Sequence, residues 1–165
     1  MSIYPQAEAN LIAVNFWHGG NQPRLMIMHI MQGTLAGTDS WFRNPASQVS
    51  AHFGIGKDGK VVQWVDTANQ AWHAAQANSY SVGVEHEGFS GDPLTDAQMD
   101  TDIALLSWLH EVHPDIALWV NSRPYSGRGL SWHGLGGVAW GDHPNCPGAP
   151  IVHQLQEITD AAKKV

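Results

Sequence analysis

An almost continuous apolar run from Leu25 to Met31 is the feature that most constrains how this chain folds. Only His29 interrupts the run. A stretch without polar alternation is typical of a strand buried on both faces in the middle of a sheet, as found in α/β proteins. The run therefore predicts an α/β fold with a central strand, and it leaves one buried imidazole that needs a partner or a function.

The neighbouring segments predict further strands of a mixed sheet. Residues 52–65 have the pattern of a β-hairpin, with Asp58-Gly59 at its turn. Residues 81–87 alternate, which puts Glu85 and Glu87 on one side of a strand and Val82, Val84 and His86 on the other. Two carboxylates are thus expected to share one face.

Three helices are expected around this sheet. Residues 37–40 offer an N-cap for a short helix that must end at Asn44-Pro45, because a residue before proline avoids the helical region. A capping box at residues 95–98 begins the longest helix, which ends at His113-Pro114. Pro150 lies in the first turn of an amphipathic C-terminal helix. The predicted fold is α/β, with a central mixed sheet flanked by helices.

Length and charge limit the classes of function. The 165 residues fit one domain, 1–165, on which residues 1–24 pack as an N-terminal extension. The net charge is -7 and there is no basic cluster, which argues against nucleic acid as a partner. No apolar stretch is long enough to cross a bilayer, so no membrane partner is expected, and the first residues lack the pattern of a signal peptide. Oligomeric state leaves no signal in the sequence.

Three residues form a candidate metal-ligand set: His29, His133 and the single cysteine, Cys146. Two imidazoles and a thiolate can hold zinc while leaving a fourth position for water. One cysteine cannot form an internal disulfide, and the following Pro147-Gly148 favours a loop. However, His29 lies more than 100 residues before the other two, so a histidine satisfied by the core and an inert buried thiol are the alternatives. Hydrolysis at a zinc centre is the first hypothesis.

Five short motifs, in this order, resemble the type 2 N-acetylmuramoyl-L-alanine amidase and peptidoglycan-recognition family, over about residues 25–160. They are Met26-Ile27-Met28-His29; Val49-Ser50-Ala51-His52-Phe53 with the Asp-Gly hairpin after it; Ala71-Trp72-His73-Ala74; Ser81-Val82-Gly83-Val84-Glu85; and Trp132-His133-Gly134 with Asn145-Cys146-Pro147-Gly148. Within this family, residues 136–143 are most similar to lysins of phages that infect actinobacteria.

The resemblance implies a metal centre and a reaction. The family's zinc ligands fall on His29, His133 and Cys146, with one Zn²⁺ per chain. Family members hydrolyse the amide between the lactyl group of N-acetylmuramic acid and the L-alanine of the stem peptide, so bacterial peptidoglycan is the expected substrate. Glu85 matches the family's Val-Gly-Val-Glu position and is the expected general acid/base, with Glu87 in reserve.

The chain departs from the family at two positions near the site. Some members have a tyrosine where this chain has Ala51, so a phenol cannot assist there. Many have a lysine or histidine two residues before the third ligand to stabilise the oxyanion, and here that residue is Pro144. His143 is the expected substitute and also the main rival of Cys146 as ligand.

The remaining histidines and tryptophans receive weaker assignments. His73, Trp72, Asn78 and Thr34 are candidate substrate contacts, and Trp64, Trp132 and Trp140 also flank the expected site in the sequence. For His52 a packing or supporting role is favoured over ligation. A structural role is expected for His86, His110, His113 and His153.

Two other functions remain open alongside the lytic amidase of a phage. A recognition module of the same fold would bind muropeptide without cutting it, although non-catalytic relatives typically lack the cysteine that this chain keeps. A zinc hydrolase of a different amide is the third hypothesis. As a lysin, the protein would be made in the cytoplasm of the host cell and act on the wall after release.

Overall fold

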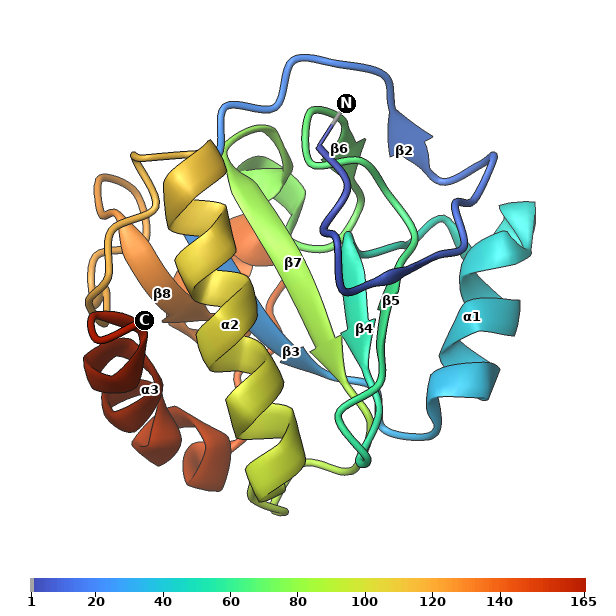
Figure 1. The fold of residues 1–165 in the computed structure, drawn as a ribbon. Coiled ribbons are helices and arrows are strands. Elements are labelled where there is room, and N and C mark those ends of the chain that lie inside the picture. Colours follow the sequence, from blue (N-terminus) through green and yellow to red (C-terminus); the bar gives the residue numbers. More distant parts are fainter. Residues whose placement is uncertain (1) are drawn as a thin grey trace.

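The computed structural model describes residues 2–165 and contains a mixed six-stranded sheet with helices on its faces (Figure 1). Its strands, in the order β1-β5-β4-β7-β3-β8, are β1 (Glu8–Ala9), β5 (Val61–Gln63), β4 (Phe53–Ile55), β7 (Ser81–His86), β3 (Leu25–Ile30) and β8 (Gly129–Trp132). A second, two-stranded sheet joins β2 (Phe16–Trp17) to β6 (Gln70–Ala71). The α-helices are α1 (Leu35–Arg43), α2 (Asp96–Val112) and α3 (Ala149–Ala162).

The apolar run forms β3, the strand on which the site depends. It pairs in parallel with β7 on one side and β8 on the other, and all six of its residues are buried. The sheet is mixed because β4 pairs in parallel with β7 but antiparallel with β5. The predicted central strand and fold class are confirmed.

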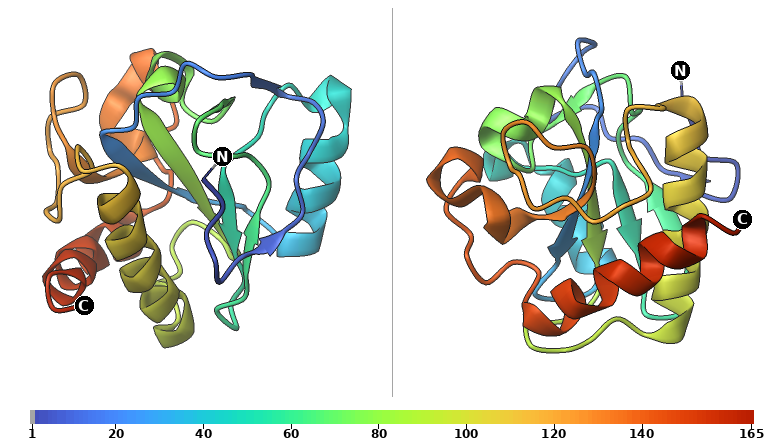
Figure 2. Two further views of the ribbon diagram at one scale, coloured as in Figure 1. Left: turned by 45° about the horizontal axis from the view of Figure 1, so that its top comes forward. Right: turned by 90° about the vertical axis from the view of Figure 1, so that its left-hand side faces the viewer.

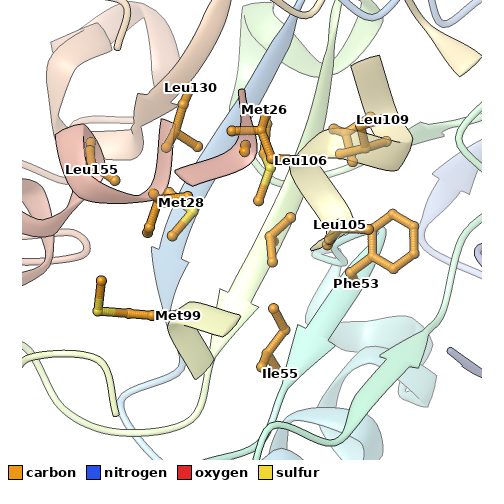
Figure 3. Packing of buried hydrophobic residues seen from close by; sticks show 14 of the residues in the cluster. Met26, Met28, Phe53, Ile55, Met99, Leu105, Leu106, Leu109, Leu130 and Leu155 are labelled. Atoms are coloured by element: carbon orange, nitrogen blue, oxygen red, sulfur yellow. The ribbon is translucent and has the colours of Figure 1, made fainter. Parts of the chain in front are cut away.

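Helices α2 and α3 cover one face of the sheet. Figure 2 shows both on the same side, and Figure 3 shows the apolar side chains between them and the strands. Alternate residues of β3 and residues from consecutive turns of α2 belong to this core. Labelled examples are Met26, Met28, Phe53, Ile55, Leu105, Leu106, Leu109, Leu130 and Leu155.

The opposite face of β3 carries the odd-numbered residues. Leu25 and Ile27 pack there against Ala74, Ala77 and Trp140. Because side chains alternate along a strand, the next residue of this series, His29, also projects away from α2 and α3. The candidate ligand therefore lies on the face covered by loops and short 3₁₀ turns.

Most predicted elements are present with small differences in their bounds. The hairpin of β4 and β5 is observed, with Gly59 alone of the Asp58-Gly59 pair at positive φ, and the capping box at Thr95 and Gln98 begins α2. The predicted start of α1 was wrong by several residues. The side chain of Thr34 accepts a hydrogen bond from the Gly37 backbone, so the helix begins at Leu35 and not after residues 37–40.

Residues 2–24 run along the edge of the molecule and pair with it at two points (Figure 2). Strand β1 extends the main sheet beside β5, and β2 pairs antiparallel with β6. Within residues 2–165, none of the helices combines the length and the apolar character that crossing a membrane requires.

Candidate metal centre and cleft

Three side chains from distant parts of the chain converge on one point. One ligand atom from each of His29, His133 and Cys146 lies within 4.8 Å of the other two. His29 lies near the end of β3, and His133 directly follows the adjacent parallel strand β8. Since parallel strands end at the same edge of a sheet, this topology brings the two imidazoles together, and the loop before α3 supplies the sulfur.

A glycine joins the segments that carry His133 and Cys146. The backbone N–H of Gly134 donates a 2.8 Å hydrogen bond to the carbonyl oxygen of Cys146. A Cβ at this position would lie 2.8 Å from the Pro144 carbonyl oxygen, closer than real Cβ atoms come. The loop that carries Cys146 passes directly against the backbone of Gly134. Only glycine fits at this position of the Trp-His-Gly motif.

In His29 and in His133, one ring nitrogen is hydrogen-bonded to a group outside the cluster. The Nε2 of His133 is 2.6 Å from the Trp140 carbonyl oxygen, and the Nε2 of His29 is 3.0 Å from the Nδ1 of His73. The Nδ1 of His29 is 3.9 Å from the sulfur of Cys146. The Nδ1 atoms are thus the ring nitrogens left to face the cluster.

Burial sets the protonation of the cluster. Desolvation lowers the pKa of His133 to about 4 and that of His29 well below its usual value, so both rings are neutral and offer a lone pair. Burial, helped by the Glu85 carboxylate, raises the pKa of the Cys146 thiol to about 12. A metal bound here must displace that proton, as thiolate ligation requires. The geometry and donor set fit a metal ion with three protein ligands and an open position.

Glu85 lies beside this cluster. Its Oε1 is 4.0 Å from the Nδ1 of His29, while its Oε2 is buried and has no hydrogen-bond partner among residues 2–165. Burial raises the pKa of Glu85 to about 7, although the neighbouring His86 opposes the shift. A buried carboxylate oxygen without a partner is costly, which is consistent with an atom that awaits water or substrate.

A cleft of about 810 Å³ opens above the cluster. Its walls come from α1 and the loop before it, from the Trp72-His73 segment, and from the loop of residues 142–146. The three candidate ligands and Glu85 all line it. Any molecule that enters the cleft therefore meets the cluster.

His143 and Glu87, the two less certain catalytic candidates, occupy different places. His143 is exposed, lines the cleft and has its ring 4.6 Å from the ring of His133, but it is not one of the three converging ligands. Glu87 does not line the cleft, and its Oε2 accepts a hydrogen bond from the Lys57 backbone. The geometry favours Cys146 over His143 as ligand and Glu85 over Glu87 as acid/base.

The four candidate substrate contacts divide into two groups. Thr34 and Trp72 line the cleft with side chains that are at least partly accessible. His73 also lines it, but both of its ring nitrogens have protein partners. Asn78 does not line it, since its buried side chain accepts hydrogen bonds from the backbones of His73 and Ala74.

Two features of the site go beyond the sequence predictions, which gave Trp41 no role and expected a structural role for His86 without naming its partners. Trp41 lines the cleft and is 54% exposed, whereas Trp64 and Trp140 are packed in the interior. Beneath the ligand strand, the fully buried His86 bonds both carboxylate oxygens of Asp102, at 2.9 and 3.0 Å, and the His29 carbonyl oxygen at 2.9 Å. The place of Trp41 in the cleft wall could have been predicted from its spacing from Thr34 and Gly37, which puts the three residues on one side of a short helix.

Together, the fold and this cluster define an α/β protein with a candidate three-ligand metal centre at the floor of a cleft. The family profile described as N-acetylmuramoyl-L-alanine amidase matches residues 19–149. The chain belongs to this family.

Two curated relatives agree with that assignment, and one solved structure shares the fold. N-acetylmuramoyl-L-alanine amidase A of Achromobacter lyticus is 48% identical over 79 residues, which are 47% of this chain and 45% of that protein. The 1,6-anhydro-N-acetylmuramyl-L-alanine amidase AmpD of Escherichia coli K12 is 38% identical over 78 residues, 42% of this chain and 43% of the relative. The match thus spans less than half of each relative. A crystal structure of an AmpD derivative superposes with a TM-score of 0.71 over 95% of this chain and 96% of its own, at 20% identity, and so shares the fold.

Proposed function

We propose that this chain is a zinc-dependent N-acetylmuramoyl-L-alanine amidase, which hydrolyses the amide between the lactyl group of N-acetylmuramic acid and the first L-alanine of the peptidoglycan stem peptide. The observation that carries the proposal is the convergence of His29, His133 and Cys146 within 4.8 Å, beside Glu85, at the floor of an 810 Å³ cleft. Both curated relatives are named for amidases of this kind.

The donor set favours zinc over other common metal ions. Magnesium and calcium prefer oxygen ligands, whereas two imidazoles and a thiolate suit zinc. A zinc ion in this position supplies Lewis acidity to the scissile carbonyl and lowers the pKa of water enough for attack near neutral pH. One ion per chain is expected, because the three residues form a single cluster.

The side chains around the cluster have distinct tasks in this proposal. Glu85 takes a proton from the attacking water and returns it to the departing amine of L-alanine, which suits a carboxylate with a pKa of about 7. His143, exposed on the cleft wall near His133, donates a hydrogen bond to the carbonyl oxygen as negative charge develops there. Thr34, Trp72 and Trp41, which line the cleft, contact the substrate.

We also propose that the protein acts as the lytic amidase of a phage, made in the cytoplasm of the host and acting on the wall after release. The support is the similarity of residues 136–143 to phage lysins. The net charge of -7 gives these 165 residues no general attraction to anionic walls, so specific contacts with the wall are expected in the cleft. Lysis of wall suspensions by added protein is the corresponding expectation.

Incubation of the purified protein with isolated bacterial walls tests the main proposal. New L-alanine amino termini should appear, disappear when a chelator removes the metal, and return when zinc is added. Tight binding to walls without any release would instead support a muropeptide-binding module. Release of amino termini other than L-alanine would support a hydrolase of a different amide.

A further inference from the structure

The half-buried imidazole of His73 links the candidate ligand His29 to the hydroxyl group of Ser81. The Nδ1 of His73 is 3.0 Å from the Nε2 of His29, and its Nε2 is 3.1 Å from the Ser81 Oγ. Gly83 of β7 makes room for this ring, because a Cβ there would lie 2.5 Å from two of the ring atoms. The ring of His73 is therefore held between a metal-ligand candidate and a serine.

His29, His73 and Ser81 form a series of hydrogen bonds that ends at the backbone of Ala77. The direction of each hydrogen bond follows from that last contact. The Ser81 Oγ lies 2.6 Å from the Ala77 carbonyl oxygen. Since a carbonyl oxygen only accepts, the single hydroxyl proton of Ser81 is used there. The Ser81 oxygen must then accept from His73, so the Nε2 of His73 carries the proton.

The same reasoning continues to the ligand itself. A 3.0 Å contact between two ring nitrogens needs one donor and one acceptor, and a neutral imidazole, the form that ligates a metal, carries a single proton. With that proton on its Nε2, His73 has a lone pair on Nδ1 and must accept from the Nε2–H of His29. The Nδ1 of His29 then keeps its lone pair, and this is the atom 3.9 Å from the Cys146 sulfur.

We infer that His73 is a positioning residue, which together with Ser81 fixes His29 as the tautomer whose Nδ1 faces the metal centre. The other histidine of the cluster is fixed in the same tautomer by a shorter route, since the Nε2 of His133 donates directly to the Trp140 carbonyl oxygen at 2.6 Å. The hydrogen bonds that fix each ligand thus end at a backbone carbonyl oxygen. His133 reaches that oxygen directly, and His29 reaches it through His73 and Ser81. The inference rests on the proposed metal centre, and it assigns His73 a role other than substrate contact.

The tautomer of His29 can be read directly in the metal-free protein. Nitrogen-15 NMR of the histidine rings should show the proton of His29 on Nε2 and that of His73 on Nε2 as well. A proton on the Nδ1 of His29 in the wild-type protein would overturn the inference without any substitution.

Substitutions test whether this arrangement matters for metal binding. His73→Phe keeps a ring but removes the acceptor, and should weaken zinc affinity by about 10–100-fold in a chelator competition assay, as for other residues that orient a ligand. His73→Asn restores an acceptor next to His29 and a donor toward Ser81, and should recover much of the loss. Ser81→Ala removes the acceptor at the far end and should weaken affinity by a smaller factor.

The readouts separate this inference from the amidase proposal. Thermal melting of each metal-free variant reports whether a change in affinity is only a loss of folding, and wild-type zinc affinity in a folded His73→Phe variant would count against the inference. If walls are not cut but the tautomers and affinities are as expected, the amidase proposal fails and the role of His73 stands. If the wild type binds no zinc, the role of His73 in metal binding fails together with the proposed zinc centre.

Discussion

Glu85 stands directly opposite His29 across two neighbouring parallel strands. The register of β3 and β7 pairs the two residues, and the Glu85 Oε1 lies 4.0 Å from the His29 Nδ1. Because side chains alternate, both project from the face away from α2 and α3. A slip of one residue would send the carboxylate to the other face, so the position of the candidate acid/base is fixed by sheet register and not by a loop.

Replacing Glu85 should separate catalysis from metal binding. Glu85→Gln keeps the size of the side chain but removes its basicity, so kcat on walls should fall by about 10²–10⁴-fold, the range typical of a lost general acid/base. Metal content, measured by atomic absorption, should stay at the wild-type level. The matched control is Glu87→Gln, two residues along the chain, whose carboxylate contacts the Lys57 backbone outside the cleft. Normal turnover in Glu85→Gln would remove this residue from the mechanism.

Exchanging the sulfur of Cys146 for oxygen tests whether this residue is the third ligand. Cys146→Ser replaces the sulfur with a poor zinc ligand, so zinc content and wall cleavage should both be lost. His143→Ala should retain zinc, because His143 is not among the three converging residues, and its kcat should fall by about 10²-fold if it stabilises the oxyanion. The opposite pattern, with zinc kept in Cys146→Ser and lost in His143→Ala, would make His143 the ligand.

Much of the fold follows from local patterns in the sequence. The apolar run of β3, broken only by His29, the capping box at Thr95 and the Asp-Gly hairpin each depend on neighbouring residues only, and each is observed. The start of α1 was missed because Thr34 and the residues from Gly37 to Ser40 offer competing caps, and only the hydrogen bond from Gly37 decides between them.

The site was predictable where its chemistry is unusual, and unpredictable where a common residue has a distant partner. A single cysteine and two histidines in family motifs are rare enough to indicate the cluster. His73 lies in a family motif that does not reveal its partner, and His86 lies in none. Their partners Ser81 and Asp102 are brought to them by strand register and by the packing of α2 on the sheet. Tertiary contacts of this kind decide function without leaving a local pattern.

Removing one partner of the buried pair formed by His86 and Asp102 should strongly destabilise the fold. Both side chains are fully buried, and although burial disfavours the charged imidazole, the Asp102 carboxylate raises the pKa of His86 overall. Asp102→Leu leaves His86 without its partner and should lower the free energy of unfolding by about 3–5 kcal/mol. Asp100→Leu, at an exposed position of the same helix, should change it by less than about 0.5 kcal/mol.

A second substitution distinguishes the ion pair from simple packing. Replacing both residues, as His86→Leu with Asp102→Leu, leaves no unpaired charge and should recover part of the lost stability in urea denaturation. If the double variant is less stable than Asp102→Leu alone, the contact of His86 with the His29 carbonyl oxygen outweighs the ion pair.

Trp41 should contribute to substrate binding rather than to folding or chemistry. It is 54% exposed on α1 and lines the cleft, so Trp41→Ala should leave the melting temperature nearly unchanged. Loss of one aromatic contact with substrate, worth about 0.5–1.5 kcal/mol beyond its area, should raise KM for solubilised peptidoglycan by several-fold with little change in kcat. Trp119→Ala is the matched control, because Trp119 is 56% exposed but lies outside the cleft. Equal effects of the two substitutions on KM would show that aromatic exposure, and not the position of Trp41 in the cleft wall, governs binding to the wall.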